Sequence, residues 1–262
     1  MKRRCFGIAA LLFPLLALVV RAAPAVESRG VQVTPSTIEM GAFYGGAKVH
    51  IGGTADASSK IIILVRGPST AEVFNKVSRV GPIWVATGKV TISGVPVLLL
   101  IFSSDPIESS LNAAAIDRYQ LNFAALMKTV EIATPAPDRD RIASDFLAFK
   151  AQRGTYRISF GSVELGVAGQ GELPYTLDFE MPRGAAPGEY QVTVLECRNG
   201  DVAHQSQVAL KLAEVGFPAL IARLAREKAA LYGFISVLIA MVAGFGIDFI
   251  AARIFKRRAA AH

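Results

Sequence analysis

The side chains that most often catalyse reactions or bind metals are few and scattered in this sequence. Its three histidines lie far apart, and none stands near a cysteine or at the spacing of metal ligands: His50, His204 and His262. The serine-nucleophile, phosphate-binding, dinucleotide-binding and zinc-protease motifs do not occur. Cys197 has only Arg198 beside it as a basic group, which gives little reason to expect a reactive thiol. We therefore expect a protein that is not an enzyme and that carries no cofactor.

A group of aspartates near the middle of the chain could suggest a cation site. Asp138, Asp140 and Asp145 lie close together, but Arg139 and Arg141 are interleaved with them. Acidic side chains are favoured near the start of a helix, where they meet the positive end of its dipole. We therefore interpret the group as a helix start and predict no metal site.

One pattern with a physical use remains, in an apolar segment near the C-terminus. Four residues recur there at every fourth position: Ser236, Ala240, Gly244 and Asp248. Small side chains at this spacing let another helix approach closely, and an acidic group within a membrane span usually faces protein. We predict that this face packs against another transmembrane helix. The alternative is ordinary span composition, with Asp248 near the inner interface, where it reaches water or Arg253.

The charge at the two ends of the chain indicates how such a span is placed. The formal net charge is +7, but residues 1–25 and 253–262 each carry four basic residues and no acid, so the remainder is nearly neutral. A basic excess confined to the ends directs membrane topology and removes the case for a nucleic-acid partner.

The first 25 residues have the three parts of a secretory signal. A basic start is followed by an apolar run to Val20, and Ala23-Pro24-Ala25 fits the small-residue cleavage rule. We predict cleavage after Ala25, with cleavage after Ala22 as the alternative. An uncleaved anchor is less favoured, because 16 apolar residues are short for a hydrocarbon core of about 30 Å.

A second apolar segment, residues 229–255, is long enough to span the bilayer. It begins with 19 uncharged residues, and Lys256-Arg257-Arg258 follow it, as is typical of the cytoplasmic side. Residues 217–228 are predicted to form a juxtamembrane helix, either at the outer headgroup level or continuous with the span. We therefore predict a single-pass inner-membrane protein with a periplasmic N-terminal domain and a cytoplasmic tail, residues 256–262.

Residues 26–216 are predicted to form the periplasmic domain, with mainly β structure. Short runs of β-branched residues recur roughly every ten residues with glycine and proline between them, which is typical of a sandwich or barrel. We predict one immunoglobulin-like β-sandwich with a helical insertion at about residues 105–153. The alternative is two small β domains joined by the helices.

The insertion is indicated by helix signals. Asp105-Pro106-Ile107-Glu108 favours a helix start with a capping box. Further helices are expected over about 122–130 and from Asp138, the last ending at Gly154 in a left-handed cap.

The last β segment carries the clearest alternation. Apolar side chains at Tyr175, Leu177, Phe179 and Met181 alternate with polar or proline residues, so one face is buried. Tyr190 follows Pro187-Gly188 and resembles the tyrosine corner of immunoglobulin-like sandwiches, whereas Val192 stands where an antibody domain has a disulfide cysteine.

The hairpin that follows has two candidate registers around Asn199-Gly200. A two-residue turn sets Val192 opposite Gln207, whereas a three-residue turn sets Tyr190 opposite Leu210 and Val192 opposite Val208. Directly opposed residues share a face, so the second register buries apolar against apolar. We predict a three-residue turn, Asn199 to Asp201.

Several stretches in this order resemble a family of putative transmembrane proteins described mainly from alphaproteobacteria. They are Arg66-Gly67-Pro68, Gly81-Pro82-Ile83-Trp84-Val85, Gly94-Val95-Pro96, Ser103-Ser104 before Pro106, Pro187-Gly188-Glu189-Tyr190, and Gly216-Phe217 through Leu231-Tyr232-Gly233. The resemblance implies an inner-membrane protein with a periplasmic domain. The family brings no assigned function and no catalytic residues.

Two functions are favoured by these features over a third, a membrane-tethered enzyme of unrecognised type. The first is a non-enzymatic accessory or interaction protein for another membrane protein, such as a transporter. The second is a periplasmic ligand-binding or sensing module, which would need a membrane partner because the cytoplasmic tail is too short for an output domain. The sequence leaves the identity of any partner or small-molecule ligand open.

Overall fold

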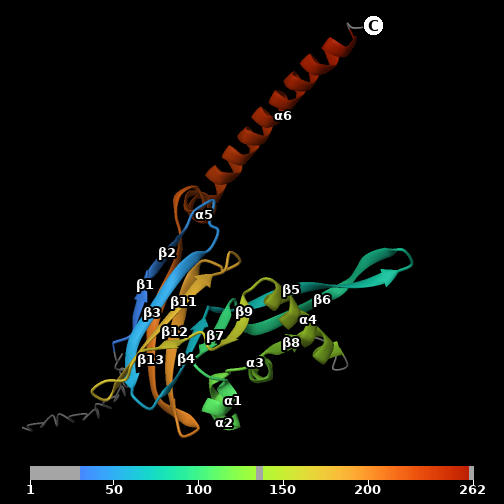
Figure 1. The fold of residues 1–262 in the computed structure, drawn as a ribbon. Coiled ribbons are helices and arrows are strands. Elements are labelled where there is room, and N and C mark those ends of the chain that lie inside the picture. Colours follow the sequence, from blue (N-terminus) through green and yellow to red (C-terminus); the bar gives the residue numbers. More distant parts are fainter. Residues whose placement is uncertain (1–29, 134–137, 260–262) are drawn as a thin grey trace, which may run out of the picture.

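The computed structural model describes residues 30–133 and 138–259, so the expected signal and its cleavage at Ala25 lie outside the described residues. Figure 1 shows a β-rich domain from which one hairpin projects and one long helix rises. The mainly β class with a single C-terminal apolar helix is confirmed.

The first sheet is antiparallel and has the order β1-β3-β11-β10. Its strands are β1 (Gln32–Thr34), β3 (Ala47–Asp56), β10 (Glu164–Leu165) and β11 (Glu172–Met181). The expected alternation in β11 is confirmed, because Tyr175, Leu177, Phe179 and Met181 are buried and their neighbours are more exposed.

The second sheet is mixed and has the order β2-β13-β12-β4-β7-β9. Its strands are β2 (Thr37–Met40), β4 (Lys60–Arg66), β7 (Leu99–Ser103), β9 (Tyr156–Phe160), β12 (Gly188–Arg198) and β13 (Asp201–Glu214). The central pairs are antiparallel, while β2 and β9 add to the two edges in parallel. The continuous apolar run 61–65 in β4 is buried throughout because both faces of this sheet are covered.

The two sheets pack face to face around one core, which includes Ile51 and Leu177 from the first sheet and Ile63 and Val194 from the second. With the edge strand β2 left out, the strand order matches A-B-E-D and G-F-C-C′-C″ of a variable-type immunoglobulin domain, whose sheets are antiparallel, whereas β9 pairs with β7 in parallel here. Strands from both halves of the chain pair in each of these two sheets.

The tyrosine corner is present. The Tyr190 hydroxyl donates a hydrogen bond of 2.6 Å to the Ala186 carbonyl, and the side chain is buried in the shared core. This contact fixes the start of β12 where it joins the sheet.

The helical insertion covers the other face of the second sheet. It contains α1 (Ile107–Ser110), α2 (Ala113–Tyr119), α3 (Phe123–Thr129) and α4 (Arg139–Gln152), which share a second core with Ile62, Leu99 and Leu195. It also supplies the long crossover that the parallel β7–β9 pair requires.

The caps of the insertion helices differ from the prediction at α1. Asn122 Oδ1 accepts a hydrogen bond of 2.7 Å from the Ala125 amide at the start of α3. The expected capping box at Asp105 is wrong, because α1 has only four residues and its N-cap, Pro106, makes no side-chain capping bond. Asp105 instead accepts a hydrogen bond from the Ser104 hydroxyl.

Residues 69–96 depart from the expected sandwich. The long strands β5 (Ser69–Val80) and β6 (Ile83–Pro96) pair with each other and with β8 (Glu131–Ala133) in a separate three-stranded sheet. Figure 1 shows this hairpin extending away from the two packed sheets.

The β12–β13 hairpin confirms the predicted register but not the predicted turn. Tyr190 faces Leu210 and Val192 faces Val208, while Arg198 pairs with Asp201 across a two-residue turn. Asn199 and Gly200 both have positive φ, 53° and 82°, as a type I′ turn requires. The extra residue is absorbed as a bulge after Glu196, which restores the apolar pairing.

Two helices end the described chain: α5 (Gly216–Glu227) and α6 (Ala229–Ala259). Lys228 separates them with non-helical backbone angles, φ −136° and ψ 55°. The juxtamembrane helix is therefore not continuous with the apolar helix, and α6 leaves the domain in a new direction (Figure 1).

Candidate functional site

The apolar helix α6 presents the predicted packing face. Among the described residues, its segment Ala229–Ala252 is the one helix long and apolar enough to cross a membrane, and none of its most apolar part is buried against the rest of the chain. The segment therefore offers its whole surface to lipid or to other helices.

The four stripe residues lie on α6 at the predicted spacing. The Ser236 hydroxyl donates a hydrogen bond of 2.8 Å to the Tyr232 carbonyl of its own helix, so it has no need of an outside partner. A Cβ atom added at Gly244 would meet nothing within 4 Å, and the same holds at Gly246. Packing of Ser236, Ala240, Gly244 and Asp248 against another helix stays a prediction.

A groove of about 380 Å³ separates the β5–β6 hairpin from α4. Its floor is aromatic: Phe74 of β5 meets Phe146 and Phe149 of α4 edge to face, with ring centroids 5.9 Å and 5.6 Å apart. Trp84 lies along the same groove and is 69% exposed. The volume of this groove lies within the range of small-molecule pockets.

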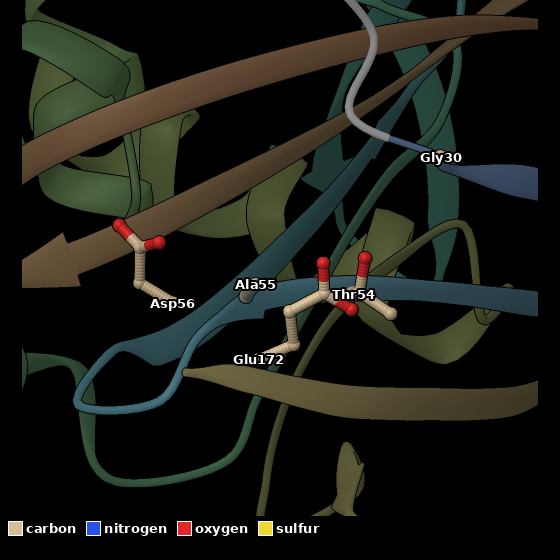
Figure 2. A pocket seen from close by; sticks show the side chains of 5 residues that line it. All are labelled: Gly30, Thr54, Ala55, Asp56 and Glu172. Atoms are coloured by element: carbon tan, nitrogen blue, oxygen red, sulfur yellow. The ribbon is translucent and has the colours of Figure 1, made fainter. Parts of the chain in front are cut away.

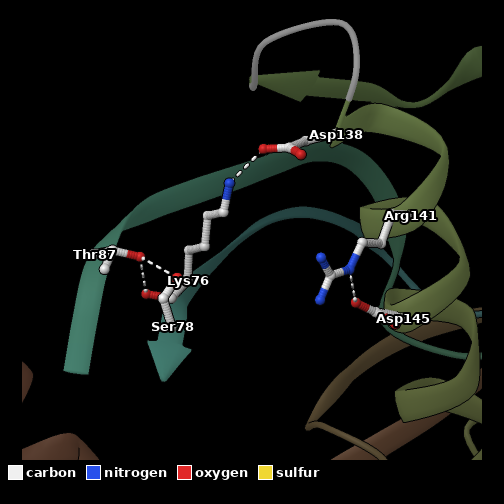
Figure 3. A network of polar contacts seen from close by, with 6 residues as sticks. All are labelled: Lys76, Ser78, Thr87, Asp138, Arg141 and Asp145. Atoms are coloured by element: carbon white, nitrogen blue, oxygen red, sulfur yellow. Dashed lines mark hydrogen bonds and ion pairs between the residues drawn. The ribbon is translucent and has the colours of Figure 1, made fainter. Parts of the chain in front are cut away.

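Ion pairs border this groove, as Figure 3 shows. Lys76 reaches from β5 to the Asp138 carboxylate, and this hydrogen bond lowers the pKa of Asp138 below its ordinary value. Arg141 and Asp145 form a looser pair on α4, with 3.9 Å between Nε and Oδ2. Asp138 is the N-cap residue of α4 but makes no side-chain capping bond, so its role is the contact with the hairpin.

A buried ion pair anchors the base of the hairpin to α4. Lys150 is 5% exposed, and its Nζ atom lies 2.5 Å from Glu72 Oε1. The same Nζ atom lies 5.4 Å from the ring centroids of Phe146 and Tyr156. Sequence reasoning missed this pair, since Glu72 and Lys150 are 78 positions apart and neither stands in a motif.

A second, polar hollow of about 420 Å³ lies at one end of the first sheet and is lined by Gly30, Thr54, Ala55, Asp56 and Glu172. Figure 2 shows the side chains of Thr54, Asp56 and Glu172 along this hollow, and Glu172 of β11 stands opposite Asp56 of β3 in the register of the sheet. Asp56 already pairs with Arg198 at 2.8 Å. The described residues contain no group of three or more potential metal ligands here or elsewhere.

The histidines and the cysteine occupy separate places. His50 Nδ1 lies 2.8 Å from Asp178 Oδ1 across β3 and β11, on the solvent face. His204 lies on β13, and His262 lies outside the described residues. Cys197 is buried, and burial is the largest of the effects that raise the pKa of its thiol to about 12, so the thiol stays protonated at neutral pH.

Comparison with known proteins gives one match. The family described as "Putative transmembrane protein (Alph_Pro_TM)" matches residues 30–256 of the chain. No curated protein and no solved structure matches the chain. The resemblance given by the sequence motifs is therefore confirmed.

Proposed function

Since the chain belongs to the Alph_Pro_TM family of transmembrane proteins, we propose that it is a non-enzymatic, single-pass inner-membrane protein that binds another membrane protein, such as a transporter. In this proposal the first 25 residues are a cleaved signal, the β domain lies in the periplasm and residues 256–262 lie in the cytoplasm. The basic N-terminus and Lys256-Arg257-Arg258 support that orientation.

The observation that carries the proposal is the uncovered surface of α6 together with its acidic residue. Asp248 stands within the candidate span Ala229–Ala252, one helical turn beyond Gly244. Ionisable residues within a span usually face protein or a water-filled cavity. An aspartate at the centre of a span disfavours insertion by about 2.5–3.5 kcal/mol, and the cost is smaller for Asp248, which lies near the C-terminal end of the segment. A second helix packed along the small residues would shield Asp248 from lipid.

The decisive experiment compares two glycines of the same helix. Gly244→Leu places a large side chain on the predicted packing face, whereas Gly246→Leu adds the same side chain on another face. Neither change meets another atom of the chain within 4 Å. We expect Gly244→Leu to reduce recovery of a stoichiometric membrane-protein partner from mild detergent, while Gly246→Leu leaves it at the wild-type yield.

A change in membrane insertion would be a trivial explanation for a lower partner yield. Leucine favours the bilayer by a few tenths of a kcal/mol on insertion scales, so both variants should insert normally. If Gly244→Leu recovers every partner at the wild-type yield, the stripe faces lipid and the proposal loses its main support.

The groove beside α4 favours a second candidate function, a ligand-binding or sensing module that acts through a membrane partner. Its volume of about 380 Å³ lies in the range of small-molecule sites, and it combines an aromatic floor with charged edges. A purified protein that lacks a stoichiometric partner but carries a bound small molecule would favour this function over the first.

A further inference from the structure

The end of the β5–β6 hairpin exposes apolar side chains, two of which, Val77 and Trp84, also border the groove beside α4. We define the hairpin tip as residues 77–86, the part beyond the aromatic contact of Phe74 with α4. Its large apolar side chains are 38% to 69% exposed: Val77, Val80, Ile83, Trp84 and Val85. Contiguous exposure of this kind marks an interaction site.

The apolar residues occupy both faces of the tip. Val80 pairs with Ile83, and the next pair along the ribbon is Arg79 with Trp84. Successive pairs point to opposite faces, so Val80 and Ile83 lie on one face and Trp84 on the other. A flat protein surface covers only one face of a two-stranded ribbon, whereas lipid surrounds both.

The charge of the hairpin selects a negatively charged partner. From Val73 to Pro96 the sequence contains three basic residues and no acidic one. Lys76 is paired with Asp138, while Arg79 and Lys89 are exposed near the tip. Tryptophan with branched aliphatic and basic side chains is the composition found where proteins meet the headgroup region of a membrane.

The bilayer is also the surface that is always close to the domain. The span tethers the domain to one membrane, so its surface is present at a high effective concentration. Figure 1 shows the hairpin and α6 extending toward the same side of the view. We propose that the hairpin tip inserts into the interfacial region of the same bilayer that α6 spans, with basic side chains on anionic headgroups.

The backbone limits the depth of this insertion. A two-stranded ribbon has free edges, and unpaired backbone groups are not tolerated in the hydrocarbon core. The turn itself has fewer bare polar groups, because Pro82 has no N–H and the Arg79 side chain donates a hydrogen bond of 3.1 Å to the Gly81 carbonyl. The tip is therefore suited to the headgroup level and the first part of the acyl chains.

This inference is independent of the proposed partner protein. It requires α6 to span the membrane but not the stripe around Gly244 to bind a helix, so each proposal can fail without the other. A second anchor at the tip would hold the domain, and with it the groove beside α4, at a constant height and tilt over the membrane.

The experiment uses the only tryptophan of the chain as its probe. The full-length protein is reconstituted into vesicles of phosphatidylcholine and phosphatidylglycerol, in which the lipids are brominated either close to the headgroup or near the end of the acyl chain. We expect a blue shift of Trp84 emission, strong quenching by the shallow bromine atoms, weak quenching by the deep ones, and protection from aqueous acrylamide.

A matched reporter controls for non-specific quenching. Trp84→Phe combined with Val167→Trp moves the probe to an exposed loop residue. The loop adjoins the β3–β4 turn, where the Ala57 amide donates a hydrogen bond to the Gly171 carbonyl. The helix α5 follows the opposite end of the sheets, where the Val215 amide donates a hydrogen bond to the Met40 carbonyl. The new probe therefore lies at the end of the sheets away from α5. We expect neither brominated lipid to quench this variant.

Two tip variants test the two parts of the proposal. Val80→Asp places a charge among the apolar side chains of the tip and should abolish bromolipid quenching of Trp84 without changing the far-ultraviolet spectrum. Lys89→Gln removes one exposed basic group. It should weaken association of the tip with phosphatidylglycerol vesicles about fivefold, as measured by bromolipid quenching of Trp84, with little change in vesicles of pure phosphatidylcholine.

Two results would overturn the inference. If Trp84 is quenched by acrylamide but by neither brominated lipid, the tip stays in water. If its emission shifts to the blue without bromolipid quenching, and the shift depends on the protein-to-lipid ratio, the tip contacts a second copy of the chain and not lipid.

Discussion

Replacing Lys150 by methionine tests whether the buried ion pair holds the insertion together. Lys150 lies on α4 at 5% exposure and pairs with Glu72 of β5. Methionine fills similar space beside Phe146 and Tyr156 but leaves the Glu72 carboxylate without its cation. The variant therefore separates the loss of the pair from the loss of packing.

The expected magnitude follows from burial. Removing one partner of a buried pair typically costs about 3–5 kcal/mol, because the other charge is left uncompensated. The Glu72 side chain is 22% exposed, so water reaches the orphaned carboxylate and we expect a smaller loss, about 2–3 kcal/mol. For a domain of this size each kcal/mol lowers Tm by about 2–4 °C, which gives a decrease of about 4–12 °C.

The assay is thermal unfolding of the full chain in mild detergent, followed by near-ultraviolet circular dichroism. This signal reports the aromatic packing of the domain and is insensitive to the helicity of α6. Lys128→Met is the matched control, since Lys128 pairs with Asp117 at 2.7 Å on the surface, where the two side chains are 64% and 50% exposed. Its Tm should change by less than about 2 °C.

A double variant gives the result that would refute the reasoning. Lys150→Met with Glu72→Met replaces both charges by apolar groups, which is often neutral for a buried pair. We expect it to recover most of the Tm lost in Lys150→Met. If the double variant is no more stable than the single one, or if Lys150→Met behaves like Lys128→Met, the pair does not stabilise the domain.

Two further predictions concern the core of the domain. Gly67→Ala would place a Cβ atom 2.6 Å from Val97 Cγ2 and 2.8 Å from Tyr190 Cε1. We therefore expect thermal unfolding to show that its free energy of unfolding is lower by about 1–3 kcal/mol. Gly41→Ala, whose Cβ atom would meet nothing within 4 Å, should unfold like the wild type. The raised pKa of Cys197, about 12 against an ordinary 9.0, means that the folded chain holds this proton more tightly than the unfolded chain, so its contribution to stability is complete below pH 9 and is lost as the pH rises toward 12. In a Cys5→Ser background at pH 8, a thiol reagent should label Cys197 only in denaturant, and rapid labelling of the native protein would contradict the burial.

Several elements could be predicted because their signals are local. The alternation from Tyr175 to Met181 identified the buried face of β11, since side chains of a strand alternate whatever it pairs with. The register of β12 and β13 followed from setting Tyr190 opposite Leu210, and the structure reaches it with a bulge in place of a longer turn. Hydrophobic pairing determined the register, whereas turn and bulge were two ways to absorb one extra residue.

Other features were mispredicted or missed because they depend on which segments meet. β5 and β6 have the composition of sandwich strands, yet they form a separate sheet because β8 from the insertion pairs with β6. The position of Asp138 before a helix predicts a helix start, but its carboxylate pairs with Lys76 of the hairpin and makes no side-chain capping bond.

The sequence by itself determined the class of this protein: a mainly β chain with one charge-free run long enough to cross a membrane. The first feature is a recurring local pattern and the second is one uninterrupted run, so both can be recognised without knowledge of any tertiary contact. Only the tertiary structure decided that the hairpin 69–96 leaves the two packed sheets, that α4 forms a groove beside it, and that Glu72 meets Lys150 in the interior. These depend on contacts between residues about forty or more positions apart, and no local periodicity encodes such a contact.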